Sequence, residues 1–294
     1  MTGDNARRWM ASGLIAASAA LAQPARGDAL PVHFSGGLGA AYDSNPGNSP
    51  SDDPQHRTTF ETLGARADWF TPMSLFTSLL VRGSVDGELY NRFDKLSNGK
   101  ATLMTRLFYK PGGDFFTPML AAYGTAAYAE YGSKLRKGAE YRGGAFVSEQ
   151  ITTAISARLD ASYTGRDARN SAFDVWNRTV GLNLDWLLPG GVTAYGGYQY
   201  RQGSIAVTIA AIAPPPTPCT GASFPYANAG AVDDAFSDSC VNRLQANTGI
   251  ASLGANVPLA PNLSLDLQGQ YVRSDAIGVS YTRTLAFASL LARF

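Results

Sequence analysis

Two histidines, His33 and His56, are the only imidazole groups that this chain offers for acid–base chemistry near neutral pH. His56 follows the carboxylates of Asp52 and Asp53, and an imidazole beside a carboxylate can act as a general base. No recognisable motif places a nucleophilic side chain beside either histidine. We therefore expect no catalytic residues and interpret the segment around His56 as a solvated loop. A hydrolase remains the third alternative for the function.

Oxygen-bearing side chains offer a second kind of chemistry. The segment Asp43-Ser44-Asn45-Pro46-Gly47, with Asp52 and Asp53 downstream, could supply ligands to Ca²⁺. The spacing of a calcium-binding loop is absent, and Asn, Pro and Gly favour an ordinary turn. No helix follows the glycines at 36, 37 and 39, so we expect them to let a strand bend rather than to bind phosphate. The sequence predicts neither a metal nor a cofactor.

Cys219 and Cys240 are the only cysteines, and four closely spaced prolines precede them. A single pair of cysteines suits an exported protein in an oxidising compartment. We expect a disulfide between them rather than two free thiols. A bridge that closes a loop of this length contributes about 3 kcal/mol in the chain-entropy model.

The N-terminal residues have the layout of a secretory signal peptide. Arg7 and Arg8 precede an apolar segment from Trp9 to Ala22, and small residues follow. We expect residues 1–22 to be removed, with cleavage possible as late as residue 29. Residues 30–294 are then expected to form a single domain.

Composition excludes two classes of protein. Lys and Arg number 24 against 23 Asp and Glu, whereas a nucleic-acid-binding protein would show a strongly basic face. Charged residues make up only 16% of the chain, below the roughly 25% of an ordinary soluble domain. No apolar run approaches the roughly 18 residues of a membrane-spanning helix, which excludes helical membrane proteins.

From about residue 32 onward the dominant pattern has a period of two, the spacing at which side chains alternate between the faces of a strand. Between Ala154 and Arg166, apolar residues such as Leu159 and Tyr163 alternate with charged residues such as Arg158 and Asp160. A helix would scatter these charges around its circumference. Such segments predict about 12 strands, near 32–42, 58–69, 75–90, 100–110, 119–131, 140–149, 153–166, 175–187, 192–209, 242–257, 263–273 and 280–294.

The strand lengths and their connections favour a barrel in a lipid bilayer over a soluble sandwich. Strands of about 10 to 16 residues can cross a bilayer at a tilt, whereas sandwich strands cluster near five or six. Short links such as 71–73 and 188–191 alternate with longer polar links such as 43–57 and 210–241. Because an unpaired backbone amide costs several kcal/mol in hydrocarbon, the first strand must pair with the last. We predict an all-β, closed antiparallel transmembrane β-barrel with short periplasmic turns and longer extracellular loops.

Aromatic residues gather near the ends of the expected strands, where their rings would lie at the depth of the lipid headgroups. They are Trp69, Phe70, Tyr90, Phe93, Tyr128, Tyr131, Trp186, Tyr198 and Tyr200.

The last strand ends the chain as Leu290-Leu291-Ala292-Arg293-Phe294. An alternating last strand that closes on a C-terminal phenylalanine resembles the terminal signature of bacterial outer-membrane β-barrel proteins. At a looser level, Tyr42-Asp43-Ser44-Asn45-Pro46 and Tyr198-Gln199-Tyr200-Arg201 resemble porin-like barrels and the barrel part of surface-lipoprotein assembly modifiers. The resemblance implies export through the periplasm to the outer membrane. It also implies contacts with lipids and with the barrel-assembly machinery, which would read Phe294.

If the apolar strand faces meet lipid, the opposite faces line the lumen. That assigns to the lumen Arg66, Asp68, Arg82, Asp86, Glu88, Arg106, Lys110, Arg142, Arg158, Asp160, Asp185, Arg201, Asp266 and Arg283. Eight of these residues are basic and six are acidic. They could form a lattice of ion pairs that fills a narrow barrel, or a polar channel whose slight basic excess favours anions.

Two functions follow from these alternatives. The first is a narrow porin-like channel for small hydrophilic solutes. The second is a non-conducting barrel that anchors or helps to export a surface component, with a surface or periplasmic protein as its partner. The long link at 210–241 could fold into the mouth as a constriction or contact such a partner, because links of this length usually have a function or are disordered.

Overall fold

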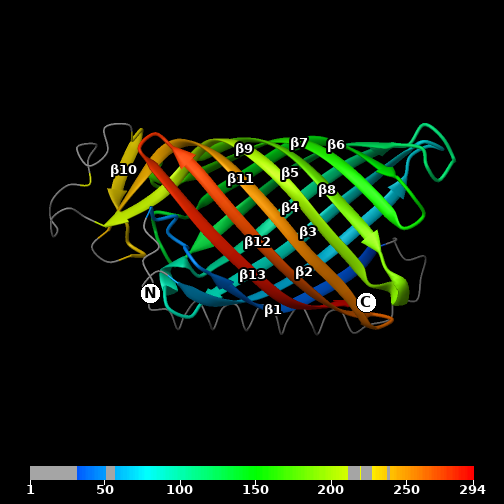
Figure 1. Cartoon of the computed structure of the whole chain (residues 1–294), viewed down its shortest axis with the longest axis horizontal. Coiled ribbons are helices and arrows are strands. Elements are labelled where there is room, and N and C mark those ends of the chain that lie inside the picture. The colour runs from blue at the N-terminus through cyan, green and yellow to red at the C-terminus, as the bar shows by residue number, and fades with distance from the viewer. Residues whose placement is uncertain (1–31, 51–56, 211–218, 220–226, 237–238) are drawn as a thin grey trace.

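Long antiparallel strands follow one another around a closed barrel, as the computed structural model of the chain shows (Figure 1). The structure describes residues 32–50, 57–210, 219, 227–236 and 239–294. In these residues twelve strands form the barrel wall, and one short strand is added beside it. The predicted fold class is confirmed.

The strand bounds lie within a few residues of the predicted ones. The wall consists of β1 (Val32–Asp43), β2 (Thr58–Pro72), β3 (Thr77–Tyr90), β4 (Asn98–Tyr109), β5 (Met119–Tyr131), β6 (Gly138–Gln150), β7 (Ile155–Ala168), β8 (Val175–Leu187), β9 (Thr193–Ala210), β11 (Ser239–Ala260), β12 (Leu263–Ala276) and β13 (Val279–Arg293). The described links contain three single turns of 3₁₀-helix: η2 (Asp94–Leu96), η3 (Ser171–Phe173) and η4 (Pro189–Gly191).

The first and last strands close the barrel. β1 pairs with β13 from Ser35 opposite Arg293 to Asp43 opposite Leu285, and the amide of Phe294 donates to the carbonyl of Phe34 at 2.9 Å. This seam leaves neither strand with an open edge, which is the condition for a sheet to be stable in hydrocarbon. The pairing of the first and last strands is therefore confirmed.

The strand that sequence periodicity misses is β10 (Ala229–Val232). It pairs with β11 between residues 240 and 243, where β11 extends beyond the pairing of β12 with β11. On its other edge this part of β11 pairs with β9. β10 thus covers the edge that β11 would otherwise expose, at the end of the barrel shown on the left of Figure 1.

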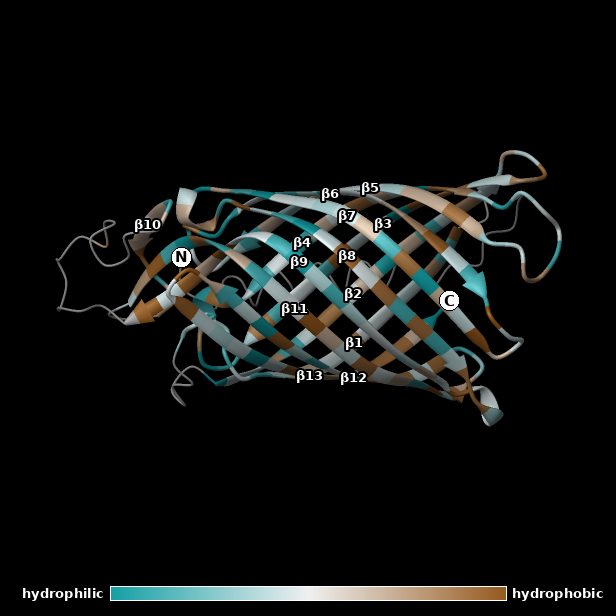
Figure 2. Ribbon diagram, turned by 45° about the horizontal axis from the view of Figure 1, so that its top comes forward, coloured by the Kyte–Doolittle hydropathy of each residue, from teal (hydrophilic) through white to brown (hydrophobic). Residues whose placement is uncertain are grey.

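Hydropathy alternates along the wall strands, as the bands of Figure 2 show. Large apolar side chains such as Leu38, Leu159 and Leu253 are exposed on the outer face. Leucines on the outer face of a barrel are removed from water only when lipid surrounds the barrel. No helix in the described part of the chain is long and apolar enough to span a membrane.

The links differ in length at the two ends of the barrel. We call the end with the longer links the outer end and the opposite end the inner end. One link at the outer end departs from the expected pattern, because only Ile277 and Gly278 join β12 to β13. Gly278 has a φ of 77°, in the left-handed region that tight hairpins require.

Candidate functional site

The inner face of the barrel carries several of the predicted charges as ion pairs between neighbouring strands. Arg82 Nε lies 2.5 Å from Asp68 Oδ1, and Arg82 Nη2 lies 2.7 Å from Asp68 Oδ2. Arg142 Nη2 donates to Ser162 Oγ at 3.0 Å and lies 3.4 Å from Asp160 Oδ2. Because strand alternation sets these side chains on one face, β2 with β3 and β6 with β7 bring opposite charges together.

Tyr123 of β5 lies flat along this face and reaches Asp160, two strands away. Its hydroxyl donates to Asp160 Oδ2 at 3.1 Å. The ring passes over Gly144 of β6, where an added Cβ would lie 2.7 Å from both the Tyr123 Cζ and its hydroxyl oxygen. Glycine at this position therefore lets the ring lie against the wall instead of projecting into the lumen.

The same arrangement recurs on the other side of the barrel. The Tyr195 hydroxyl of β9 donates to the carboxylate of Asp266 on β12, at 3.1 Å from Oδ1 and 3.0 Å from Oδ2. The ring crosses Gly254 of β11, where an added Cβ would lie 2.4 Å from Tyr195 Cζ. Asp160 and Asp266 are thus each bound by a tyrosine two strands away, and the tyrosine ring crosses a glycine on the intervening strand.

Arg106 has no carboxylate partner among the described residues. Its guanidinium instead lies 5.4 to 5.8 Å from the ring centres of Phe108, Tyr123 and Phe146, within cation–π range. The positive charges of Arg82 and Arg158 repel it. This part of the wall therefore carries an excess of positive charge.

The other predicted residues have fewer contacts. Asp86 accepts from Ser84 Oγ at 3.0 Å, Glu88 from Asn98 Nδ2 at 2.9 Å and Asp185 from Ser156 Oγ at 3.4 Å. Arg283 pairs with Asp43, and its Nε lies 2.9 Å from Asp43 Oδ1. Within the described part of the chain, four predicted residues make no ion pair and no hydrogen bond through their side chains: Arg66, Lys110, Arg158 and Arg201.

Sequence reasoning missed a second group of charges near the outer end. Glu140 lies between Lys100 at 3.7 Å and Arg166 at 3.8 Å. The periodicity of β4, β6 and β7 puts these three residues on the same face as Arg106, Arg142 and Arg158, so the signal was present in the sequence. Asp43, considered as a calcium ligand, instead has a fully buried carboxylate that pairs with Arg283.

The outer mouth is filled by links that fold inward. Asp233, just after β10, has a fully buried side chain that accepts from Arg136 Nη2 at 2.6 Å and from Thr208 Oγ1 at 2.7 Å. Phe236 follows three residues later and packs against Phe93, with ring centres 4.8 Å apart. Both rings belong to an apolar cluster built on Phe60, Tyr90 and Leu96.

The first link of the barrel also folds inward and crosses to β9. Its Asn48 Nδ2 donates to the carbonyl of Ala206 at 3.1 Å, and Ser49 Oγ donates to the carbonyl of Thr208 at 2.8 Å. The Thr208 amide donates to the carbonyl of Gly47 at 2.9 Å. Beneath it, a second apolar cluster packs Val207, Leu244, Val272, Val279 and Tyr281 together. The outer mouth of the lumen is therefore packed with side chains of the described residues.

The fold resembles that of solved outer-membrane proteins. An outer membrane channel from Pseudomonas putida F1 matches with a TM-score of 0.58 and 13% identity, over 92% of this chain and 100% of that chain. The chain has the fold of a bacterial outer-membrane β-barrel. The KdgM porin matches with a TM-score of 0.42 and 10% identity, over 88% of this chain and 99% of that chain. The outer membrane phospholipase of Salmonella typhi matches with a TM-score of 0.46 and 8% identity, over 92% of this chain and 94% of that chain. No protein-family model and no curated protein sequence matches the chain.

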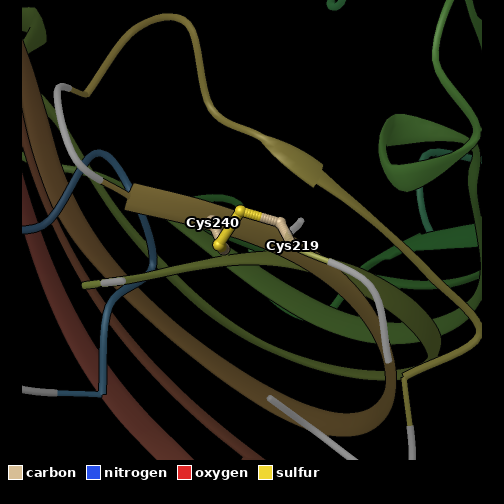
Figure 3. The surroundings of a disulfide bond; sticks show 2 residues. All are labelled: Cys219 and Cys240. Atoms are coloured by element: carbon tan, nitrogen blue, oxygen red, sulfur yellow. A yellow bond between two sulfur atoms is a disulfide. The ribbon is translucent and has the colours of Figure 1, made fainter. Parts of the chain in front are cut away.

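The disulfide of this β-barrel joins Cys219 to Cys240, as expected (Figure 3). Cys240 lies in the extension of β11 that pairs with β9 and β10. Both cysteines are buried. The bridge therefore fastens the longest link of the barrel to its wall at the outer end.

Of the two histidines considered for acid–base chemistry, only His33 is among the described residues. His33 lies in β1 opposite Asp68 of β2 and makes no side-chain hydrogen bond or ion pair with a described residue. His56, Asp52 and Asp53 lie outside the described residues. The described part of the chain contains no group of three or more His, Cys, Asp or Glu that could hold a metal ion.

One part of the expected aromatic belt is wrong. Trp186, Tyr198 and Tyr200 are exposed on the outer face, but three of the expected residues lie inside. Tyr90 is buried and stacks on Phe60 with ring centres 4.6 Å apart, Phe93 packs on Phe236 in the mouth, and the Tyr131 ring centre lies 4.8 Å from the Arg166 guanidinium. Tyr90 shares the strand face of Arg82, Asp86 and Glu88, so the alternation of β3 directs it inward. The prediction for Tyr90 used its position near the end of the strand. The face that a side chain occupies is set instead by whether its residue number is odd or even along the strand.

Proposed function

We propose that the protein is a narrow porin-like channel of the outer membrane that admits small hydrophilic solutes and favours anions. The observation that carries the proposal is the group of basic side chains on the inner face that lack a carboxylate partner, namely Arg66, Arg106, Lys110, Arg158 and Arg201. Charged side chains that line a pore set its selectivity. The fold shared with the Pseudomonas putida F1 channel supports this proposal.

The flat tyrosines support an open inner lumen in the same proposal. A structural lattice would direct side chains towards the axis and fill the barrel. Tyr123 and Tyr195 instead lie over Gly144 and Gly254, which keeps their rings close to the wall. The filled outer mouth makes the passage narrow, so we expect a small conductance with transitions between closed and open levels.

The proposal also covers the surroundings of the barrel. The exposed leucines of the wall would contact outer-membrane lipids, and Phe294 would be read by the barrel-assembly machinery during insertion. No enzymatic activity forms part of the proposal, and no surface or periplasmic protein is needed for it.

Conductance in planar lipid bilayers tests the channel. Purified protein should give discrete current steps, and a KCl gradient should give a reversal potential of the sign expected for chloride preference. Current no greater than that of protein-free bilayers would overturn the proposal and favour the non-conducting barrel. In that case a protein that co-purifies stably from intact membranes would identify the anchored or exported component.

A further inference from the structure

The inner part of the lumen contains a polar cavity of about 310 Å³. Five strands contribute to it: β7, β8, β9, β11 and β12. This volume lies at the lower end of the range for small-molecule sites. The lining side chains that matter below are Arg158, Asn183, Gln199, Arg201, Gln268 and Gln270.

Two of these side chains are positive charges without a partner. Arg158 and Arg201 make no ion pair among the described residues, in contrast to Arg82, Arg142 and Arg283. The Arg158 guanidinium lies 5.6 Å from the ring centre of Phe146 and makes no hydrogen bond with a described residue. A guanidinium presents paired donors that match the two oxygens of a carboxylate. Arg158 and Arg201 therefore offer the cavity donors that a carboxylate group could use.

The acidic groups near the cavity do not cancel both charges. Asp185 lines the cavity and accepts from Ser156 Oγ at 3.4 Å. Asp266 accepts from the Tyr195 hydroxyl but does not itself line the cavity. Among the residues that line the cavity, two arginines therefore stand against one carboxylate, and Asp185 keeps oxygen lone pairs that can accept from hydroxyl groups.

The neutral side chains of the cavity point to a hydroxylated ligand. Asn183, Gln199, Gln268 and Gln270 make no side-chain hydrogen bond with a described residue. Each carboxamide offers both a donor and an acceptor, as neighbouring hydroxyls of a sugar require. An alkyl carboxylate would leave these carboxamides without a ligand partner, whereas the hydroxyls of a polyol can pair with them.

We propose that this cavity binds a monosaccharide-sized sugar acid, with its carboxylate at Arg158 and Arg201 and its hydroxyls at the four carboxamides. The inference deepens the proposed channel function, because it names the class of anion that the lumen would select. Binding itself requires only the folded barrel, so it can be measured separately from conduction.

Calorimetric titration of the purified barrel in detergent tests the site. Glucuronate is the probe, and glucose and propionate provide the neutral sugar and the simple carboxylate. We expect glucuronate to bind at least tenfold more tightly than either control, because neither can use both halves of the site. Equal affinity for propionate and glucuronate, or no binding of glucuronate, would overturn the inference.

Matched variants locate the site. R158Q and R201Q should each weaken glucuronate binding about tenfold or more, since each removes a charge-assisted contact. R273Q is the control, because Arg273 alternates to the outer face of β12 and its ion pair with Asp275 is exposed. Equal loss in R273Q, or unchanged binding in both cavity variants, would contradict the assignment. Refolded yield and melting temperature establish that each variant folds.

The two proposals fail in different ways. Current steps without glucuronate binding would leave the channel standing and remove the sugar-acid site. Glucuronate binding without current would support the sugar-acid site and contradict the proposal that the protein is a channel.

Discussion

Arg136 and Asp233 form an ion pair between two links that lie 97 residues apart in the chain. Arg136 Nη2 lies 2.9 and 2.6 Å from the two carboxylate oxygens, and the Asp233 side chain is fully buried. The same guanidinium packs on the ring of Phe173, 4.2 Å from its centre. This pair fastens the segment that carries Phe236 into the outer mouth.

We expect Asp233→Asn to loosen the mouth and increase the channel's conductance. Breaking a buried pair leaves an uncompensated charge and costs about 3–5 kcal/mol, here confined to the links at the outer end. Current recordings should show longer open times, and hydrogen exchange at 233–236 should accelerate. Asp275→Asn is the matched control, because its pair with Arg273 is 55–68% exposed and is worth at most about 1 kcal/mol. Unchanged open times in Asp233→Asn would show that this ion pair does not hold the mouth closed.

Gly144→Ala should destabilise the barrel, whereas Gly143→Ala should not. The new Cβ at 144 would lie 2.7 Å from both the carbonyl oxygen of Ala161 and the Tyr123 ring, so the ring must move. Overpacking of this kind costs about 1–3 kcal/mol. At Gly143 an added Cβ meets nothing within 4 Å. Urea unfolding of the two variants in the same detergent compares them directly, and equal midpoints would argue against the flat tyrosine.

The wall of the barrel could be predicted from the sequence because its pattern is local. Alternation over ten or more residues indicates both that a segment is a strand and which side chains share a face. Arg158 and Asp160 could therefore both be assigned to the lumen. The same parity could have placed Tyr90 and the group around Glu140 correctly. Strand β10 was missed because its four residues are too few to show a period.

The filled mouth could not be predicted, since its contacts join residues far apart in the chain. Ser49 and Thr208 are separated by 159 residues, and Asp43 and Arg283 by 240. Nothing in the composition of the first link distinguishes one that folds inward from one that projects outward. The partners of Arg82 and Arg142 depend in the same way on strand register, which periodicity alone leaves undetermined.

Arg106→Gln should reduce the preference for anions. Arg106 is repelled by Arg82 and Arg158, and its removal lowers the positive potential in that part of the lumen. The reversal potential in a KCl gradient should move towards that of a non-selective pore. Arg178→Gln serves as the control, because Arg178 lies on the outer face over the ring of Trp176. A reversal potential that shifts equally in both variants would indicate that the lumen charge does not set selectivity.

Replacing both Cys219 and Cys240 with serine should loosen the longest link without unfolding the wall. The bridge spans 21 residues, and its loss removes about 3 kcal/mol of loop-closure stabilisation in the chain-entropy model. Hydrogen exchange should accelerate in β10 and in β11 near Cys240, where the link is fastened. Exchange in β4, which belongs to the remote wall, is the internal reference. Uniform acceleration across both regions would show that the bridge supports the whole barrel.

Phe294→Ala should impair insertion in cells while leaving the folded barrel intact. The Phe294 ring is 69% exposed on the outer face, and its only described bond uses the backbone amide, which alanine retains. The ring therefore adds little to the seam, and the variant should refold in detergent with an unchanged unfolding midpoint. Its amount in the outer membrane should fall severalfold if assembly reads the terminal ring. Phe34→Ala removes a comparable ring from the adjacent strand, 39% exposed, and is the control. Equal membrane levels of the two variants would show that the terminal position carries no special signal.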